Sequence, residues 1–399
     1  MKENWKYKKL TDVVWFQEGP GVRNTQYTDS GVKLLNVANL INGKVDLSTS
    51  KRYISEEEAY GKYRHFLVDE GDFIIASSGI QVEYFEKKMG FISASQLPLC
   101  MNTSTIRFKA LDKNVLNMRF FMYYLKSEDF KHQLSRQITG IAQLNFGPLH
   151  LKRMSMPITD FETQSRIVSE LDLLQSIIDK QKAQLKELDN LAQAVFYDMF
   201  GDPVENEKGW EVKKLGDECT DMKYGTSRPS CENGKYSYLR MCNISSDGHL
   251  DLNNLKTIDV PDDEVEKCIV RYGDILFNRT NSIDLIGKTC MFDLETPMII
   301  AGYIIRVRLS EKLESRFVSC MFNMPSMKKL LRAMAKGAVN QANINSKELA
   351  SIIIPIPPVI LQHSFASKNE SIEKQKAAIN QSIAETQKLF DYTMDKYFG

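Results

Sequence analysis

Two segments of the chain carry apolar residues at alternating spacings of three and four, which is the pattern of one face of a long helix. In the first segment this face is formed by Leu171, Leu174, Ile178, Gln181, Leu185, Leu188, Ala192, Val195 and Met199. These are the a and d positions of a heptad repeat, so they predict a coiled-coil helix. The second segment repeats the face more weakly, with Lys376 at one seam position and otherwise Ile372, Ile379, Ile383, Thr386, Phe390 and Tyr397.

Polar and small residues mark the ends of the first helix. After Pro157, Thr159 and Glu162 have the spacing of a capping box, which predicts that the helix starts there. Gly201, followed by Pro203, predicts its end. Each helix then comprises about 40 residues and is about 60 Å long, at about 1.5 Å per residue.

The rest of the chain consists of short apolar runs separated by turn signals. Runs such as Gly31–Leu35 and Asp72–Ala76 read as strands, and Gly-Asp pairs at 71–72 and 273–274 are natural turns into strands. Shorter helical patterns occur among them, for example at Met118–Leu125. These regions therefore predict mixed α+β domains.

The chain also repeats itself once, with a period near 200 residues. Seven matches occur in the same order, and their offset falls from 205 to 198, as loops of different length would cause. The matched segments are Trp5–Leu10 with Trp210–Leu215, Leu35–Asn39 with Leu239–Asn243, Asn42–Leu47 with Asp247–Leu252, Val68–Asp72 with Val270–Asp274, Gln143–Asn145 with Gln341–Asn343, Pro157 with Pro355, and Met199–Gly201 with Tyr397–Gly399.

We therefore expect two mixed α/β domains, residues 1–158 and 204–356, each followed by a helix, residues 159–203 and 357–399. Because an exposed heptad seam needs a partner, the two helices are expected to pack on each other in antiparallel directions. A pseudo-two-fold axis would relate the two halves and place one domain at each end of the helix pair. The alternative is that each helix folds back on its own domain as an ordinary core helix.

The composition of the 399 residues is that of a soluble globular protein, with 43% hydrophobic and 26% charged residues. The longest apolar run is far shorter than the roughly 20 residues that span a bilayer, and no export signal is visible. Seven cysteines without a Cys-x-x-Cys pair favour reduced thiols over disulfides or a zinc site. We therefore expect a cytoplasmic protein with no membrane contact.

The net charge of +1 hides a segregation of charge along the chain. Residues 1–158 carry 22 Lys and Arg against 16 Asp and Glu, whereas residues 159–203 carry 4 against 9. A basic domain next to an acidic helix fits a nucleic-acid surface beside an element that contacts another protein.

Common catalytic motifs are missing from the sequence. It has no phosphate-binding loop, dinucleotide fingerprint, Gly-x-Ser-x-Gly elbow, His-Glu-x-x-His pair or Asn/Asp-Pro-Pro-Tyr motif. Asp72 with Glu86 and Lys88 resembles the metal site of a nuclease, but the second half has no counterpart after Asp274. We read this triplet as a chance occurrence and expect neither a catalytic site nor a metal site.

Polar residues on three pairs of turns are candidates for contacts with DNA. Arg can make two bonds to guanine, Asn and Gln can make two bonds to adenine, and Ser and Thr suit phosphates. Such residues also occupy ordinary turns, but here the two halves share a framework while these loops differ, as the reading of two different half-sequences requires. The candidates are Arg23, Asn24, Gln26, Tyr27, Ser77, Ser78, Gln143 and Asn145 in the first half, and Thr226, Ser227, Arg228, Asn278, Arg279, Thr280, Asn281, Gln341 and Asn343 in the second.

With these motifs in their duplicated order, the chain resembles the specificity subunit of a type I restriction–modification system. The resemblance covers the whole length, including Trp5 and Trp210, the paired Gly-Asp turns, the segments that open the helices with Gln164 and Gln362, and Met199–Gly201. It implies two target-recognition domains that each read half of a bipartite double-stranded DNA site, and helices that set the unread gap.

The resemblance also implies partners. Two modification subunits would bind S-adenosylmethionine and methylate adenine, and restriction subunits would translocate and cut DNA. The chain itself would then be a non-catalytic subunit without a cofactor. The acidic first helix and its partner helix are expected to dock the modification subunits.

Three alternatives remain open. The chain could serve an orphan methyltransferase or a combined restriction–methylation system, which its sequence does not distinguish from the first reading. It could be a self-contained nuclease, for which Asp72, Glu86 and Lys88 are the only support. It could also be a scaffold whose coiled coil binds proteins, and a steep loss of DNA binding with salt would argue against that class.

Overall fold

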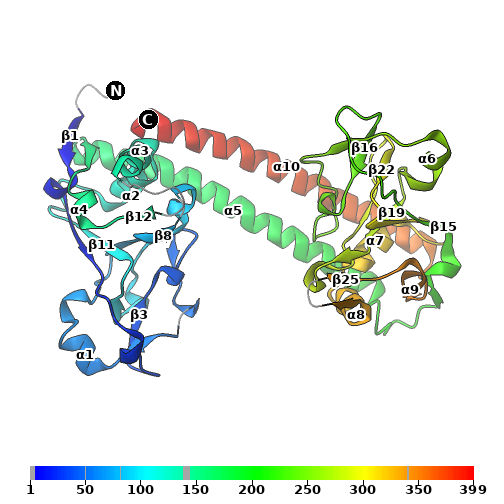
Figure 1. The fold of residues 1–399 in the computed structure, drawn as a ribbon, viewed down its shortest axis with the longest axis horizontal. Coiled ribbons are helices and arrows are strands. Elements are labelled where there is room, and N and C mark those ends of the chain that lie inside the picture. Colours follow the sequence, from blue (N-terminus) through cyan, green and yellow to red (C-terminus); the bar gives the residue numbers. More distant parts are fainter. Residues whose placement is uncertain (1–4, 50, 81, 138–143, 339–340) are drawn as a thin grey trace. The chain divides into compact units, whose positions relative to one another are not determined.

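The computed structural model describes residues 5–49, 51–80, 82–137, 144–338 and 341–399 (Figure 1). The chain divides into two compact units. The first contains the residues up to Gln181 together with Ser382–Gly399, and the second contains Lys182–Gln381. Each unit therefore combines one mixed domain with half of each long helix. We call residues 5–158 the first head and residues 204–356 the second head.

The two long helices are α5, Phe161–Phe200, and α10, Val359–Phe398, with 40 residues each. Both lie inside the ranges expected from the heptad pattern. The capping prediction is wrong in detail, because the Oδ1 atom of Asp160, not the Thr159 hydroxyl, accepts the hydrogen bond of Thr163 N at 2.7 Å. Asp160 is the residue directly before the helix, so its side chain satisfies a backbone amide that has no partner within the helix.

The heptad seam of α5 is buried at Leu171, Leu174, Ile178 and Leu188 and half-buried at its other predicted positions, and the helices are antiparallel. In the first unit Leu171 and Ile178 near the start of α5 share a core with Phe390 and Tyr397 near the end of α10. In the second unit Phe196, near the end of α5, packs against Phe365, near the start of α10, with ring centroids 5.4 Å apart. In both units, therefore, the beginning of one helix lies against the end of the other.

The two packing alternatives from the sequence turn out to be compatible. The core of the first unit contains Phe120 and Tyr124 of the first head as well as residues of both helices. The second unit has the same plan, because Phe317 of its head stacks on Phe196 with centroids 5.7 Å apart. Each helix thus pairs with the other helix and also covers a head.

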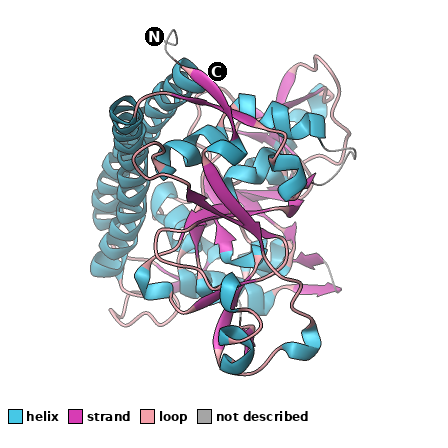
Figure 2. Cartoon of the chain, turned by 90° about the vertical axis from the view of Figure 1, so that its left-hand side faces the viewer, coloured by secondary structure: helices cyan, strands magenta, loops and turns pink. Residues whose placement is uncertain are grey.

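Each head mixes short strands, short helices and loops (Figure 2). The first head has an antiparallel sheet in the order β2-β11-β7-β9 and a smaller sheet in the order β10-β3-β6. Its strands are β1 Lys6–Lys9, β2 Val14–Glu18, β3 Val32–Leu35, β4 Leu40–Ile41, β5 Lys44–Val45, β6 Tyr53–Ile54, β7 Phe73–Ala76, β8 Ser78–Ile80, β9 Met89–Phe91, β10 Leu99–Met101, β11 Thr105–Ala110, β12 Leu144–Asn145 and β13 Ser155–Ile158. Its helices are α1 Glu56–Tyr60, α2 Met118–Lys126, α3 Glu128–Gln137 and α4 Pro148–Leu151.

The second head repeats this topology. Its main sheet has the order β15-β23-β19-β21, and its second sheet has the order β17-β16-β22-β18. The strands are β14 Val212–Lys214, β15 Cys219–Tyr224, β16 Tyr236–Leu239, β17 Lys256–Ile258, β18 Ile269–Val270, β19 Ile275–Asn278, β20 Thr280–Asn281, β21 Thr289–Met291, β22 Met298–Ile300, β23 Ile304–Leu309, β24 Lys336–Ala338, β25 Gln341–Asn343 and β26 Ile353–Pro355. The helices are α6 Asp262–Cys268, α7 Ser315–Asn323, α8 Pro325–Met334 and α9 Ser346–Ala350.

A buried glutamine at the start of each long helix joins that helix to its head. Gln164 accepts from Asn117 N at 3.0 Å and donates to the carbonyl oxygens of Val115 and Thr159. Gln362 makes the equivalent bonds, accepting from Glu314 N at 2.8 Å and donating to two carbonyl oxygens. Both side chains are 0% exposed. The duplication therefore extends to individual hydrogen bonds.

Two glycines show the same repeat at the end of the edge strand in each head. Gly225 corresponds to Gly19, because Gly19 N and Gly225 N donate to the first residues of β11 and β23, Thr105 O and Ile304 O. A Cβ atom would lie 2.0 Å from a carbonyl oxygen at Gly19 and 2.1 Å from one at Gly225, whereas Gly21 has open space. The close approach of another backbone thus requires glycine at the first two positions.

No helix in the described parts of the chain is both long and apolar enough to cross a membrane.

Lys328 on α8 is half-buried in the second unit and makes the stability of that unit depend on pH. Burial, with smaller contributions from the charges of Arg332 and Lys288, lowers its pKa to about 8. Its Nζ atom donates to Gly287 O at 2.8 Å. In the unfolded chain the group titrates near 10.5, so between these two values the unfolded state binds more protons and stability rises with pH.

We expect Lys328→Met to stabilise the chain at pH 7 by up to about 3 kcal/mol, which is the cost of burying the charge. The advantage over the wild type should shrink as the pH rises from 8 toward 10.5. Denaturant unfolding across this range measures it, and Lys329→Met, at the exposed neighbouring position, is the control. An advantage that does not change with pH would contradict this explanation.

Candidate nucleic-acid interface

A pocket of about 620 Å³ in the second head brings together four residues predicted to contact DNA, Thr226, Ser227, Arg228 and Arg279. The loop after β15, the end of β19 and the turn before β23 form its walls. Arg240 and Tyr303 also line it. Three arginines thus line this space. Glu264 pairs with Arg228, but no carboxylate is among the described lining residues, so the charges of Arg240 and Arg279 suit a nucleic acid.

The loop after β15 is held firmly in the head. Gly225 fits against the carbonyl oxygen of Ile300, and Thr226 N donates to the same oxygen at 2.9 Å. The Tyr238 hydroxyl donates to the carbonyl oxygens of Thr226 and Arg228, at 3.4 and 3.2 Å. The backbone of the loop is therefore fixed while Ser227 and Arg228 stay exposed.

The three arginines are engaged to different degrees. Arg228 makes a two-pronged bond to Glu264, with its Nε and Nη2 atoms 3.0 and 2.6 Å from the carboxylate oxygens. The Nη2 atom of Arg240 donates to Asn254 O at 2.8 Å. Arg279 uses only its Nε atom, which donates to Asn343 Oδ1 at 3.1 Å, and its guanidinium lies 4.8 Å from the centre of the Tyr224 ring.

The first head holds different residues at the corresponding positions. Ser77 corresponds to Arg279, since the backbone of each bonds to equivalent residues on both sides. Glu18 corresponds to Tyr224, because both end the edge strand and pair with equivalent positions of the next strand. Burial raises the pKa of the Glu18 carboxyl above its usual value. The frames match, so the two heads differ in the chemistry that they carry here.

The first loop of the first head places some of its predicted residues at the surface. Arg23 and Asn24 are exposed. Gln26 instead closes the loop, because its Oε1 atom accepts from Arg23 N and its Nε2 atom donates to Glu58 at 2.7 Å. Tyr27 packs under Arg52, whose guanidinium lies 5.4 Å from its ring centre. Of the predicted residues of this loop, Arg23 and Asn24 are therefore the ones that are exposed to a ligand.

Several residues predicted to contact DNA are buried, or lie outside the residues that the structure describes. Ser77 is 1% exposed and Asn278 is 0% exposed, so the structure does not present either side chain to DNA. Gln143 lies outside the described residues, and of Gln341 only the backbone is described.

The remaining candidates belong to the paired turns. Asn145 pairs with Ser78, and Asn343 with Thr280, at equivalent places in the two heads. Asn343 Oδ1 also accepts from the Thr280 hydroxyl at 3.0 Å, and Asn281 Oδ1 accepts from Ser282 N. The sequence therefore located matching turns correctly, although some of these side chains brace the turn.

Sequence reasoning missed Tyr224, Arg240 and Tyr303. Tyr303 falls in an apolar run that reads as a strand, Tyr224 follows the mostly polar segment 219–223, which gives no clear signal, and Arg240 lies in a repeated segment that was taken as framework. The available signal was the mismatch between the repeats, since Arg240 replaces Asn36 in a matched segment. The replacement of Glu18 by Tyr224 follows only from the strand pairing. Differences within a shared framework thus mark candidate reading positions.

The nuclease-like residues of the first head have structural partners. Asp72 accepts from Asp69 N and forms ion pairs with Arg107 at 3.2 Å and Lys109 at 3.3 Å. Asp274 repeats this arrangement with Arg271 N and Arg308. Among the described residues, no group of three or more His, Cys, Asp or Glu side chains could hold a metal ion. The paired aspartates thus have a common role in closing the Gly-Asp turn.

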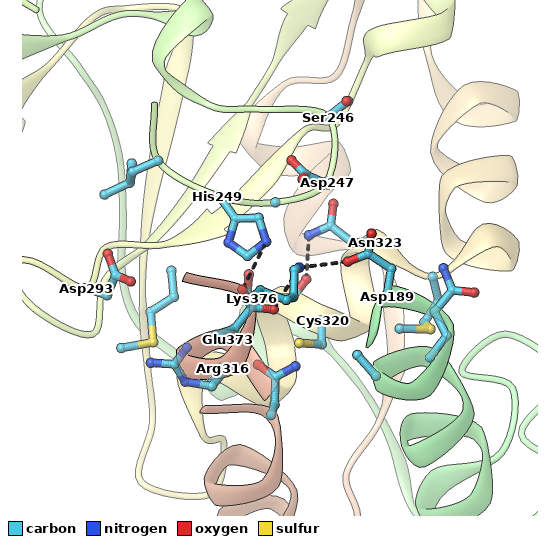
Figure 3. A pocket seen from close by; sticks show the side chains of 18 residues that line it. Asp189, Ser246, Asp247, His249, Asp293, Arg316, Cys320, Asn323, Glu373 and Lys376 are labelled. Atoms are coloured by element: carbon cyan, nitrogen blue, oxygen red, sulfur yellow. Dashed lines mark hydrogen bonds and ion pairs between the residues drawn. The ribbon is translucent and has the colours of Figure 1, made fainter. Parts of the chain in front are cut away.

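A second hollow, of about 330 Å³, lies in the second unit between its head and the long helices (Figure 3). Lys376 at the seam pairs with Asp189 at 2.7 Å and with Glu373 at 3.1 Å, and His249 Nε2 lies 3.6 Å from Glu373. Asp247 and Asp293 also line the hollow. This surplus of carboxylates is unsuited to phosphate, in contrast to the pocket of the three arginines.

The second hollow has a simple steric cause. Cys320 and Ala192 line it, whereas the corresponding positions of the first unit hold Tyr123 and Phe390. Those two rings fill the space there, with centroids 6.2 Å apart. Smaller side chains therefore leave the second unit hollow where the first unit is packed.

Solved structures share this duplicated architecture. An S subunit of a type I restriction–modification system from M. genitalium superposes with a TM-score of 0.57 at 14% identity, covering 99% of this chain and 96% of that one. A chain from a structure that describes complex assembly and conformational transition of the type I R-M system gives 0.58 at 18% identity, with 99% and 98% coverage. The fold is thus that of the S subunits of type I systems.

Sequence comparisons agree with the fold. The chain is 22% identical to the type I restriction enzyme EcoKI specificity subunit of Escherichia coli (strain K12), over 100% of this chain and 89% of that protein. The StySPI specificity subunit of Salmonella potsdam is similar to the same extent. The family model of the type I restriction modification DNA specificity domain matches residues 2–190 and 207–388. The chain therefore belongs to the type I restriction–modification specificity subunit family.

Proposed function

We propose that this chain is the DNA sequence-recognition subunit of a type I restriction–modification complex, in which each head reads one half of a bipartite site and the helices set the unread gap. The observation that carries this proposal is the pocket lined by Arg228, Arg240 and Arg279, in a head whose frame is repeated elsewhere in the chain. Phosphate contacts from such residues position a protein on DNA, and contacts with base edges discriminate sequence.

The difference between the heads predicts an asymmetric site. The second head carries Tyr224 and Arg279 where the first carries Glu18 and Ser77. The guanidinium of Arg279 and the carboxyl group of Glu18 favour different bases. In the major groove, guanine offers acceptors to an arginine, whereas cytosine offers an amino donor to a carboxylate. The two half-sequences should therefore differ.

The chemistry of restriction and modification belongs, in this proposal, to partner subunits. Two modification subunits would bind S-adenosylmethionine, flip the target adenine out of the duplex and methylate it, and restriction subunits would cut. The names of the relatives and the solved assembly of a similar chain support such partners. The chain itself would act without catalysis or cofactor. The acidic first helix and its partner helix would dock the modification subunits.

A specificity subunit of an orphan methyltransferase or of a combined restriction–methylation system would use the same interface. A pure protein scaffold is disfavoured, because Arg240 and Arg279 line a pocket with no carboxylate among its described lining residues, and a scaffold that binds through its helices gives that pocket no part to play. DNA binding by the full chain should fall steeply with salt if the pocket and surrounding cations contact phosphates.

The decisive experiment is methylome sequencing of DNA from cells that carry this chain together with the modification subunits of its own system. We expect a new bipartite motif, with methylated adenine in both halves and a fixed gap. Cells that carry the modification subunits alone are the control. An assembled complex that binds DNA and methylates no bipartite motif would contradict the proposal.

A further inference from the structure

Arg279, between β19 and β20 in the second head, is held rigidly from two directions. Its Nε atom donates to Asn343 Oδ1 at 3.1 Å, and its guanidinium plane lies over the Tyr224 ring at 4.8 Å. Both supports are themselves fixed. The Thr280 hydroxyl donates to the same Asn343 oxygen, and the Tyr224 hydroxyl bonds to Ser346 at 2.9 Å. Cation–π stacking and the Nε bond together select one orientation of the side chain.

The end of this side chain has no partner among the residues that the structure describes. Within the described parts of the chain, neither terminal NH₂ group of Arg279 has a hydrogen-bond partner, and Arg279 lines the pocket of about 620 Å³. The other two arginines of this pocket have partners for their terminal nitrogens. Glu264 accepts hydrogen bonds from Nε and Nη2 of Arg228, and Asn254 O accepts one from Nη2 of Arg240. Arg279 therefore offers a planar pair of donors to a ligand in the pocket.

The two terminal nitrogens of Arg279 indicate which chemical group would bind them. Two parallel donors in one plane match two acceptors in one plane, and in the major groove guanine alone presents two, O6 and N7. Phosphate also accepts two bonds, but a flexible surface cation serves that purpose, whereas an oriented fork loses little conformational entropy on binding. We propose that Arg279 reads a guanine in the half-site bound by the second head.

The first head supplies an internal comparison. The position of Arg279 is occupied there by Ser77, which is buried and whose Oγ atom has no partner in the described structure. Glu18 stands where Tyr224 supports the fork. A guanine contact of this kind is therefore specific to the second head, and its loss should leave the other half-site unchanged.

This inference rests on the proposed function, and the test separates the two. The wild-type complex with its modification subunits should methylate a bipartite motif that requires guanine at one position of one half-site. Arg279→Gln should lower the preference for that guanine by roughly 5- to 150-fold, the range for a good bidentate pair, with the other half-site and the gap unchanged. Arg271→Gln is the matched control, since Arg271 pairs with Glu266 outside the pocket.

Different results would contradict the guanine assignment and the proposed function. Uniformly weaker methylation of an unchanged motif in Arg279→Gln would show a phosphate contact and overturn the guanine assignment. A wild-type motif with no guanine in either half-site would also overturn it. The absence of any bipartite motif in the wild type would overturn the proposed function itself, and the assignment with it.

A second measurement does not depend on whether the variant folds. It compares the affinity of the wild-type complex for duplexes in which 7-deazaguanine replaces one guanine of the motif at a time. This substitution removes the N7 acceptor of that guanine. We expect about ten-fold weaker binding for one guanine, since one of the two bonds is lost. Equal binding to all substituted duplexes would overturn the assignment, even if Arg279→Gln fails to assemble.

Discussion

Insertion of seven residues into each long helix is expected to lengthen the unread gap of the recognised site by about three base pairs. Seven residues add about 10 Å of helix at about 1.5 Å per residue, and B-DNA rises about 3.4 Å per base pair. The insertions belong after Gln181 in α5 and after Gln381 in α10, where the two compact units meet along the chain. All contacts within each unit are then preserved.

The number seven matters for the seam. Seven residues restore the heptad phase to within about 20°, whereas four residues rotate the following residues by about 40°. The insertion points lie opposite each other, because Gln181 donates to Ser382 at 2.7 Å. Methylome sequencing measures the gap, and both half-sites should stay the same.

The control for the insertion is a heptad in α5 alone, which shifts one seam past the other and should abolish recognition of any fixed gap. A doubly extended chain that methylates the original motif with its original gap would show that the helices do not set this distance. Changed half-sites would contradict the assignment of base reading to the heads.

Gln362→Glu is expected to destabilise the second unit by about 4 kcal/mol at neutral pH, because it leaves a buried, unpaired charge. The carboxylate would still accept from Glu314 N. It could not donate to Lys312 O or Pro357 O, which now receive the amide hydrogens of Gln362. Two carbonyl oxygens would then face a negative charge in a site that is 0% exposed.

The effect of Gln362→Glu should depend on pH. Burial raises the pKa of a carboxyl in the folded state above its unfolded value of about 4.3. The loss of stability is therefore full above the folded pKa and shrinks as the pH falls toward 4. Denaturant unfolding at several pH values measures it. Gln375→Glu, at an exposed position of the same helix, is the control and should change stability little.

Much of the fold could be predicted because its signals are local and repeated. A heptad seam indicates which face of a helix is buried, whatever the partner is, and Leu171, Ile178 and Ile372 are buried accordingly. The seam is wrong at the end of α5, where Phe196 and Phe200 are buried and Val195 and Met199 are only half-buried, because the apolar side chains of the second head cover that side of the helix. The repeat predicted two heads of one topology. It also located Asn39 and Asn243, whose side chains make equivalent bonds in both heads.

The candidate site was only partly predictable, because its geometry depends on residues distant in sequence. Arg279 and Asn343 are 64 residues apart, and no local pattern shows that one orients the other. Asn278 ends a strand that is buried on both faces, so its polar side chain looked like a surface group in the sequence. Thr159 and Asp160 are both capable of capping, and only the backbone direction at the helix start decides between them.

The division of the chain into units has a consequence for its synthesis. Phe390 and Phe398 complete the core that covers Phe120 of the first head, and the Trp5 ring lies 6.4 Å from that of Phe398. The 200 residues Lys182–Gln381 are translated in between, which takes roughly 10–40 s at about 5–20 residues per second. During that interval the apolar face around Phe120 lacks the part of its cover that Phe390 and Phe398 provide. The second unit is continuous in sequence, so it is free to fold first, in the reverse of the order in which the heads are made.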